Sequence, residues 1–378
     1  MSVMSWRRSP LADRHRALGS NLEDWNGMET AWTYTTGNLP DEHDAIRTRA
    51  AIMDVSGLRK FHLVGPNSHH VLQRTTTRDV RKLYPGRSVY ACMLNEAGKF
   101  TDDCIIYRTG PNSWMVVIGS GSGHEELTKE LPGLNAALLF DDDLQDLSLQ
   151  GPLAVDYLSK HVPGIRELKY FHHMQTTLFG RHVMISRTGY TGERGYEIFC
   201  RAEDAPAIWD QIVSEGKAMG IGPASFTALD WLRVESYLLF YPYDNSQMYP
   251  FENEPPGDTL WELGLDFTVS KGKKGFRGAE EHYRLKGKER FKIFGVIADT
   301  DKVLDAGDEL YAGDRKVGVV TCGMYSRQTK RSLAIARLAV DAAKQGVALE
   351  VKGRSVQCAA KANPINFDDP GKTKRTAS

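Results

Sequence analysis

The segment from Arg187 to Ile198 contains the side chains best suited to hold a flat heterocycle. It reads Arg-Thr-Gly-Tyr-Thr-Gly-Glu-Arg-Gly-Tyr-Glu-Ile, so that glycines surround Tyr190 and precede Glu197. Glycine-rich backbone can approach a ligand closely. Tyr190 offers a ring face for stacking, and Glu197 offers two acceptor oxygens to a planar pair of donors. This chemistry suits a pterin, although on local grounds a bulged hairpin with a solvated glutamate is the simpler interpretation.

A second candidate is the acidic pair Asp102 and Asp103, which follows a turn and begins an apolar strand ending near Tyr107. Neighbouring residues of a strand face opposite ways, so we expect only one of the two carboxylates to point into a pocket. Such a carboxylate serves as a general base or as a fixed negative charge. The alternative is a turn that carries two solvated acids.

The run from Val116 to His124 reads as a strand followed by Gly-Ser-Gly-Ser-Gly. It resembles a phosphate-binding loop, but the G-x-G-x-x-G pattern fails because His124 stands where the third glycine is needed. No clear βαβ unit surrounds the run, so a dinucleotide site is disfavoured.

The histidines and cysteines do not indicate a metal site or a nucleophile. His172 and His173 lack a second group of ligands at matching spacing, and the pair His69 and His70 has only a distant cysteine. The five cysteines are scattered and form no C-x-x-C pair, so we expect small buried side chains at 92, 104, 200, 322 and 358.

The composition excludes several classes of partner. In 378 residues, Lys+Arg and Asp+Glu each total 48, so no basic field is present to hold nucleic acid or an anionic membrane. Apolar runs are too short for a membrane span, and the first residues lack the apolar core of a signal peptide. These features predict a cytoplasmic enzyme that acts on small molecules.

The pattern of strands and helices must position these residues. Apolar periodicity predicts helices at 40–53, 124–131, 152–161, 205–220 and 229–241, and strands at 60–64, 88–94, 104–108, 114–118, 175–178 and 182–186. After Arg290 the pattern is all β, with strands at 291–298, 309–312, 316–322, 333–338 and 348–351. Because helices and strands do not alternate regularly, the fold class is α+β rather than a doubly wound sheet.

Short motifs occur in a collinear series: Asp41-Glu-His-Asp-Ala-Ile-Arg47, Asp54-Val-Ser56, the strand of Asp102 and Asp103, Leu149-Gln-Gly-Pro152, Gly189 to Ile198, Leu232-Arg-Val-Glu235, Glu262-Leu-Gly-Leu265 and Phe276-Arg-Gly278. In this order and spacing they resemble the aminomethyltransferase (T-protein) family of the glycine cleavage system, over nearly the whole chain. The family includes folate-dependent demethylases, so the resemblance implies tetrahydrofolate as cofactor.

The resemblance also implies an architecture: three domains in a clover-leaf around a central folate channel, the last a β-barrel. We expect a discontinuous folate-binding domain at 1–55 and 140–285, and a second α+β domain at 56–139. The barrel is expected at 286–367, followed by a flexible tail at 368–378.

Carried over position by position, the family's functional residues fall on five side chains here. Asp102 matches the catalytic carboxylate near the reactive folate nitrogens. Tyr190 and Glu197 match residues that hold the pterin, Tyr90 matches a ring-packing tyrosine, and Val117 matches a pocket wall. No metal is implied.

The chain departs from the family pattern mainly on the side expected to face the donor. Leu229 stands where the glycine cleavage enzyme has an arginine, which removes a planar donor fork. Gly119 replaces an asparagine, and Phe267 replaces a tryptophan. Glu235-Ser236 followed by Leu238-Leu239 is closer to the demethylase members. We therefore expect the family's cofactor with a different one-carbon donor.

The leading hypothesis is a methyl transfer from a small methylated donor (a sulfonium, a betaine-type ammonium or a methoxy compound) to tetrahydrofolate, which gives 5-methyl-tetrahydrofolate. One alternative is a true T-protein, whose partner is a lipoyl carrier protein and whose product is 5,10-methylene-tetrahydrofolate. Another is a folate-binding assembly factor of the same fold, although its Lys-Gly-Cys-Tyr-x-Gly-Gln-Glu motif is not found.

The stretch 237–261 is aromatic and acidic, and it is the candidate donor site. An electron-rich cage for an onium head could be formed by Tyr237, Tyr241, Tyr243, Tyr249, Phe251 and Trp261, with Asp244, Glu252 and Glu254 among them. Trp231 and Arg233 on the preceding helix are further candidates. The alternative is a surface loop whose aromatic side chains pack on the neighbouring domain.

Overall fold

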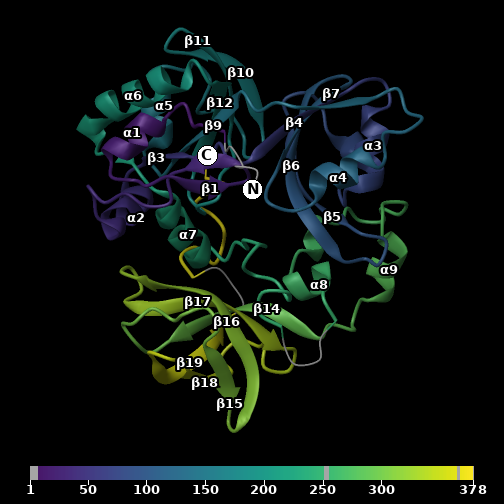
Figure 1. Ribbon diagram of the computed structural model, residues 1–378, viewed down its shortest axis with the longest axis vertical. Helices are drawn as coiled ribbons and strands as arrows, with labels where there is room; N and C mark the ends of the chain where they lie inside the picture. The colour runs from purple at the N-terminus through teal and green to yellow at the C-terminus, as the bar shows by residue number, and fades with distance from the viewer. Residues whose placement is uncertain (1–6, 251–254, 364–366, 378) are drawn as a thin grey trace, which may run out of the picture.

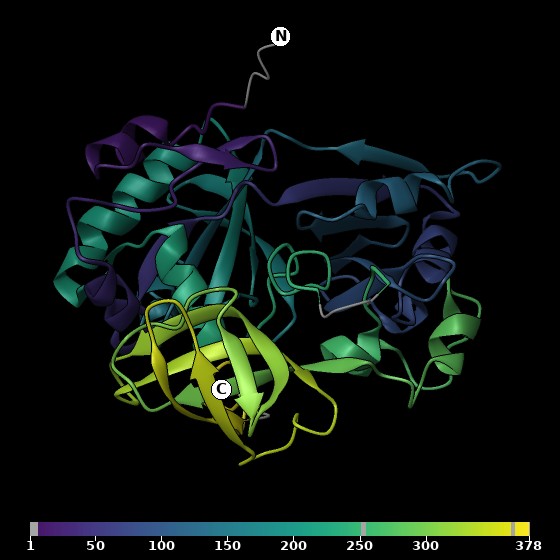
Figure 2. The same cartoon turned by 60° about the horizontal axis from the view of Figure 1, so that its bottom comes forward.

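Three lobes of the chain meet around a shared centre in the computed structural model (Figure 1). The structure describes residues 7–250, 255–363 and 367–377. Two lobes are each built on an open β-sheet and the third is a closed β-barrel, and α7 (Phe226–Glu235) lies between one of the sheet lobes and the barrel. Figure 2 brings the barrel in front of the two sheet lobes. The expected α+β clover-leaf with a C-terminal barrel is confirmed.

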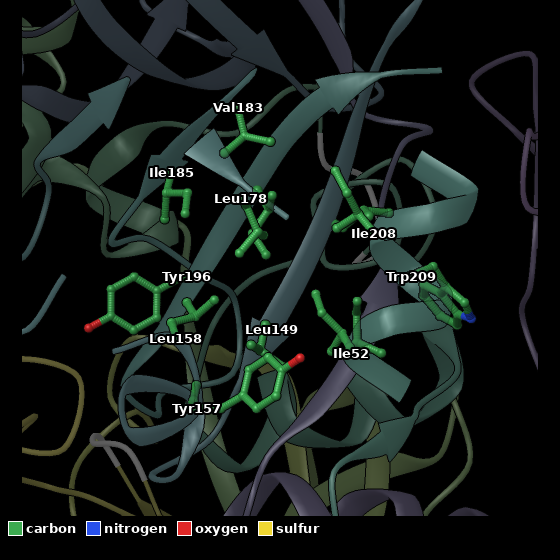
Figure 3. Close-up of a cluster of buried hydrophobic side chains, with 14 of the residues drawn as sticks. Ile52, Leu149, Tyr157, Leu158, Leu178, Val183, Ile185, Tyr196, Ile208 and Trp209 are labelled. Carbon is green, nitrogen blue, oxygen red and sulfur yellow. The ribbon is translucent and has the colours of Figure 1, made fainter. Parts of the chain in front are cut away.

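The first lobe is a six-stranded sheet with helices packed against it. Its strands run in the order β10 (His173–Leu178), β11 (Arg181–Ser186), β12 (Gly195–Arg201), β9 (Leu144–Gln150), β3 (Ala51–Asp54) and β13 (Gly222–Pro223). Its helices are α1 (Ala12–Ala17), α2 (Leu39–Thr48), α5 (Ala154–Leu158) and α6 (Ala205–Gly216), followed by a 3₁₀ turn at Lys217–Met219. Ile208 and Trp209 of α6 are buried against the sheet beside Ile52 and Leu149 (Figure 3), as the helical period predicts.

The second lobe is a five-stranded antiparallel sheet. Its strands run in the order β5 (Ser88–Leu94), β6 (Phe100–Gly110), β7 (Ser113–Ile118), β4 (Arg59–Val64) and β8 (Ala137–Phe140). Against it lie α3 (Ser68–Thr75), a 3₁₀ turn at Val80–Lys82, and α4 (Gly123–Thr128). The core between them includes Leu72, Ile106 and Trp114. The strands predicted at 60–64, 88–94, 104–108 and 114–118 are all present.

The barrel accounts for the all-β pattern after Arg290. Its strands close in the order β14 (Phe291–Ala298), β17 (Arg331–Ala339), β16 (Arg315–Ser326), β15 (Glu309–Ala312), β18 (Ala348–Lys352) and β19 (Gln357–Asn363). Before it come α8 (Leu260–Leu263), a 3₁₀ turn at Asp266–Thr268, and α9 (Ala279–Arg284), which Figure 2 shows beside the second lobe. A small hairpin of β1 (Glu23–Trp25) and β2 (Met28–Thr30) stands apart from the three sheets.

Helix boundaries are where the sequence-based expectation was wrong. The predicted helix 229–241 is α7, which begins at Phe226 because Ser225 caps it through its hydroxyl. It ends at Glu235 because Tyr237 adopts a left-handed φ of 52°, which breaks the helical path. Similarly, the predicted helix 40–53 ends at Thr48, and its last apolar residues form β3.

The described helices are also too short or too polar to cross a lipid bilayer.

Candidate active site

A cavity of about 1320 Å³ lies where the three lobes meet. Its walls come from β5, β6 and β7, from the loop after β7, from the segment that follows α7, and from the start of β14. Elements from distant parts of the sequence therefore share one interior surface, and most of the side chains singled out in the sequence reach it.

Glu197 presents a buried carboxylate to this cavity from the start of β12. Its Oε2 accepts hydrogen bonds from the hydroxyls of Thr188 and Tyr107, the second at 3.3 Å. Burial raises its pKa, and these two hydrogen bonds oppose the rise. Its Oε1 accepts no hydrogen bond from the described residues, and Glu197 lines the cavity. One acceptor oxygen is thus available to a ligand.

The glycine-rich loop before Glu197 is held by Gln150. The Gln150 amide donates to the Thr188 carbonyl at 3.1 Å and accepts from the Thr191 hydroxyl at 3.1 Å. A Cβ at Gly189 or Gly195 would overlap the Gln150 side chain, so only glycine fits there. This packing explains why the Leu-Gln-Gly-Pro motif and the glycine-rich loop occur together in one chain.

Tyr190 also lines the cavity, at the tip of the same loop. Its hydroxyl donates to the Leu239 carbonyl, which ties the loop to the segment after α7. The hydroxyl is therefore engaged by the protein, and what the residue offers a ligand is its ring.

Asp102 and Asp103 both line the cavity, as do their neighbours Thr101, Cys104 and Ile105. A β-bulge lies beside them, because Thr101 of β6 is an extra residue with no partner between Met93 and Leu94 of β5. Asp102 is 2% exposed and accepts backbone N–H bonds from Asp103 at 2.9 Å and from Gly123 at 2.8 Å. Burial and, second, the charge of Asp103 raise the pKa of Asp102 to about 7.

The glycine loop after β7 closes over Asp102. A Cβ at Gly121 would lie 2.8 Å from the Asp102 Cβ, and a Cβ at Gly123 would lie 2.7 Å from Asp102 Oδ2. The glycines are therefore needed for close packing against a carboxylate. This is the role of the run that resembled a phosphate-binding loop.

Tyr90 and Val117, the two remaining residues that the family resemblance singled out, also line this cavity. Tyr90 on β5 lines the cavity and donates its hydroxyl to Asp103 Oδ2 at 2.7 Å. Val117 on β7 is 5% exposed and forms part of the wall. The structure thus brings Tyr90, Asp102, Val117, Tyr190 and Glu197 to a single cavity.

The candidate donor residues after α7 divide into two groups. Tyr237, Tyr241 and Trp261 line the cavity. Tyr243 instead packs against Phe240 and is 38% exposed, and it is not among the described residues of the wall, nor is Tyr249. Phe251, Glu252 and Glu254 lie outside the described residues.

Trp231 and Arg233 of α7 are also absent from the described wall. Arg233 is fully buried and pairs with Asp230 at 2.7 Å and with Asp244. These two carboxylates neutralise the charge of Arg233 inside the protein, so Arg233 is not a candidate for binding the donor. Trp231 faces His43 of α2, with ring centroids 6.3 Å apart.

An aromatic wall in the same cavity as Asp102 was not foreseen. Trp25 lines the cavity from β1, donates its indole N–H to Ser120 at 3.2 Å, and lies 4.8 Å from the Phe226 ring. Phe226 and Phe240 continue the wall, together with Leu229. These residues are scattered in the sequence without a shared motif, so no sequence signal links them.

The C-terminal segment contributes the last part of the wall. Lys372, Arg375 and Thr376, which belong to the segment predicted to be a tail, line the cavity. Lys374 anchors it by pairing with Asp368 at 2.8 Å and with Glu193 at 3.1 Å. Cationic side chains therefore lie in the same cavity as Glu197.

Two family models match the chain. The model described as the GCVT N-terminal domain covers residues 11–273, and the model described as the glycine cleavage T-protein C-terminal barrel domain covers residues 292–367.

Relatives and a solved structure agree with these matches. The chain is 67% identical over 373 residues to a heme-dependent oxidative N-demethylase gamma subunit from Ectopseudomonas mendocina, with 99% of each chain covered. It is 30% identical over 373 residues to an aminomethyltransferase from Bacillus cytotoxicus, with 97% of this chain and 99% of that protein covered. The crystal structure of the glycine cleavage system aminomethyltransferase T from Bartonella henselae superposes with a TM-score of 0.86 at 25% identity, covering 97% of this chain and 99% of that one.

Proposed function

The chain belongs to the glycine cleavage T-protein family, a family of tetrahydrofolate-dependent transferases, and on that premise we propose that it transfers a one-carbon unit derived from an N-methylated amine to tetrahydrofolate. The unit reaches this chain already oxidised to the level of formaldehyde, so the transfer itself involves no change of oxidation state, and the product is 5,10-methylene-tetrahydrofolate. The observation that carries this proposal is the buried Asp102, whose pKa of about 7 suits an acid–base group at neutral pH.

The residues of the cavity fit tetrahydrofolate. The free Oε1 of Glu197 can accept from the N–H groups along one edge of a pterin, and Tyr190 can stack on its face. When bound, tetrahydrofolate supplies the nucleophilic nitrogens that accept the carbon. Tyr90 and Val117 complete the pocket around its rings.

Asp102 has the role of proton donor in this proposal. Its carboxyl group donates a proton to the oxygen or nitrogen that leaves the one-carbon unit, and its carboxylate then stabilises the positive charge left behind. The enclosing Gly121 and Gly123 exclude water from one side of the carboxyl group and hold its orientation. A group positioned in this way contributes roughly 10²–10⁴ in rate.

The two kinds of relative support the oxidation level. One is named as an oxidative N-demethylase subunit and the other as an aminomethyltransferase. Oxidation of an N-methyl group gives a carbon at the level of formaldehyde, and an aminomethyl carbon is at the same level. Both names therefore point to a donor carbon that is bound to nitrogen. A proton donor is useful in such a transfer because it can protonate the leaving nitrogen.

A second candidate is direct methyl transfer to give 5-methyl-tetrahydrofolate, the reaction that the sequence favoured. The observation in its favour is the wall of Trp25, Phe226 and Phe240 in the same cavity as Asp102, which suits a methylated cation. An onium donor leaves as a neutral molecule and needs no acid, so this reaction does not use the protonated form of Asp102.

Transfer from a lipoyl carrier protein, as in a true T-protein, is a third possibility with less support. Leu229 lines the cavity where the glycine cleavage enzyme has an arginine, and no apolar side chain can replace its hydrogen bonds.

The test is to identify the product. The protein is incubated with tetrahydrofolate and, separately, with formaldehyde, with aminomethyl compounds, with methylated ammonium or sulfonium donors, and with a lipoyl carrier bearing the aminomethyl group. The proposal predicts 5,10-methylene-tetrahydrofolate formed faster than in the enzyme-free reaction, which must be subtracted because formaldehyde and tetrahydrofolate condense spontaneously. Formation of 5-methyl-tetrahydrofolate from an onium donor would instead establish the second candidate.

A further inference from the structure

Arg78 lies on the cavity wall with most of its hydrogen-bonding capacity unused. It follows α3 and lines the cavity beside Tyr90. Its Nε donates to the Tyr90 carbonyl at 2.9 Å, while its two Nη groups donate to no described residue. Burial, the largest influence, lowers its pKa, which indicates a guanidinium that is partly desolvated without a carboxylate beside it.

Hydrogen bonds hold the backbone around Arg78 in place. Lys273 is 6% exposed, and its ammonium donates to the carbonyls of Thr76 and Arg78, each at 2.6 Å. The next residue, Asp79, donates its N–H to the Ser270 hydroxyl at 3.0 Å. A turn held at three points presents Arg78 in one orientation, so the side chain is poised for a ligand rather than free in solvent.

Two aromatic rings lie beside this arginine. The Phe267 ring is 59% exposed and lines the cavity, and the Arg78 guanidinium lies 6.0 Å from its centroid. The Tyr90 ring is nearly parallel to it, at 25° and 6.4 Å. An exposed aromatic ring next to an unused cation makes a surface that suits an aromatic group carrying an anion.

Arg87, Lys292 and Arg375 of the wall already interact with other residues of the protein, and Lys372 lies with Arg375 on the C-terminal segment. Arg87 donates to the Tyr170 carbonyl at 3.3 Å and to the His172 ring at 3.0 Å. Lys292 donates to the Trp261 carbonyl at 3.5 Å. Arg375 interacts with Tyr170. The cation placed beside the exposed ring of Phe267 is therefore Arg78.

Resting on the proposed function, we propose that Arg78 binds a carboxylate of the glutamate end of tetrahydrofolate, and that it is the residue by which the protein prefers glutamylated pterins. With the pterin at Glu197 and the reacting nitrogens at Asp102, the cofactor continues past Tyr90, and its aminobenzoyl ring reaches Phe267. The two Nη groups then bond one carboxylate in the bidentate manner that guanidinium favours.

The test compares binding of two stable analogues, 5-formyl-tetrahydrofolate and 5-formyl-tetrahydropteroate, which lacks the glutamate. Dissociation constants are measured by calorimetry for the wild type, Arg78→Gln, Arg78→Lys and a control, Lys82→Gln, which removes an exposed charge from the same turn. A charge-assisted pair is worth about 10- to 100-fold in affinity.

We expect Arg78→Gln to weaken binding of 5-formyl-tetrahydrofolate by that factor and to leave 5-formyl-tetrahydropteroate unchanged. Arg78→Lys should recover part of the loss, and Lys82→Gln should behave as wild type. Equal weakening of both analogues would mean a merely structural role, and no weakening of either would mean no contact; each result overturns the inference. If the wild type binds neither analogue, the proposed function itself fails.

Discussion

Among single residues, Asp102 is the one on which the proposed reaction depends most. A carboxyl group that accepts two backbone N–H bonds would ordinarily have a low pKa, but here burial and Asp103 outweigh them and raise the pKa of Asp102 to about 7. Such a group is available in both protonation states at neutral pH. Perturbed acids of this kind are concentrated at functional sites, and the geometry of the cavity agrees.

The pH dependence of turnover follows from this pKa. If protonated Asp102 donates to the leaving group, kcat/KM should be at its plateau below pH 7 and fall as the pH rises through about 7. The check is a pH–rate profile of the wild type with the uncatalysed rate subtracted at each pH. A rate that rises through pH 7 would show that Asp102 acts as a base instead.

Replacing Gly121 tests the loop that encloses Asp102. In Gly121→Ala the added Cβ would lie 2.8 Å from the Asp102 Cβ, so the loop or the carboxyl group must move. We expect kcat to fall about 10- to 100-fold, because displacement by a fraction of an ångström misplaces a reacting group. Gly222→Ala, where a Cβ has no neighbour within 4 Å and the backbone is not at positive φ, is a control for the general effect of replacing a glycine. Equal kcat in the two variants would contradict this role.

Residue types predicted part of this site and not the rest. Glu197, Tyr190 and Asp102 could be singled out because their loop or strand carries a local motif. Trp25 and Phe226 could not, since they reach the cavity only through tertiary packing. The bulge at Thr101 was also beyond prediction, because it exists only in the pairing of β6 with β5.

At the scale of elements, α2, α7 and the barrel are joined by a buried ionic cluster. Glu235 on α7 accepts from His43 at 2.8 Å, from Arg47 at 2.9 Å and from the Ser326 hydroxyl at 2.5 Å. Burial alone would raise its pKa, but the hydrogen bond from His43 and the charge of Arg47 lower it from 4.5 to about 2. Glu235 is therefore ionised, and its carboxylate links α7 to α2 and to β16.

Glu235→Gln should destabilise the protein in a pH-dependent way. Because the folded-state pKa of Glu235 is depressed, its contribution is complete above about pH 4.5 and is lost as the pH falls toward 2. The shift corresponds to roughly 3 kcal/mol at neutral pH. The free energy of unfolding is measured with denaturant at both pH values. The variant should be much less stable than the wild type at pH 7, and the difference should be smaller at pH 3. The exposed Glu203→Gln is the control, and equal stability of the two variants at pH 7 would refute the assignment.

The sequence predicted which helices and strands occur better than it predicted the residues at which they begin and end. Strands β4, β5 and β7 follow the apolar runs, whereas β9 and β12 were not predicted. In α7 the apolar pattern continues to Tyr241, but the chain leaves the helix at Tyr237, whose hydroxyl donates to the Ile293 carbonyl of β14. That contact exists only once the barrel has packed against the helix.

At the scale of the whole molecule, the cavity is produced by assembly of all three lobes. Neither sheet alone encloses Asp102 and Glu197, which stand on different sheets. The arrangement could be anticipated only from the family resemblance, because composition and periodicity say nothing about how lobes are placed. For example, nothing in the sequence indicated that the C-terminal segment lines the cavity.

Removal of residues 368–378 should open the cavity without unfolding the lobes. The truncation takes away Lys372, Arg375 and Thr376 from the wall and the Lys374 pairs with Glu193. We expect the dissociation constant for 5-formyl-tetrahydrofolate to rise about 10-fold, as loss of one charge-assisted contact would give. Calorimetric binding of the truncated chain measures it, with thermal unfolding as the control for folding. An unchanged affinity would show that the segment lines the cavity without contacting the cofactor.

The most direct test of the central claim is the rate at which 5,10-methylene-tetrahydrofolate forms from formaldehyde and tetrahydrofolate in a single turnover. We predict that the wild type accelerates this reaction above the enzyme-free rate. The rate with Asp102→Asn should be about 10²- to 10⁴-fold lower than with the wild type, although the variant should still bind 5-formyl-tetrahydrofolate. Full acceleration in Asp102→Asn, or no acceleration by the wild type, would contradict the account.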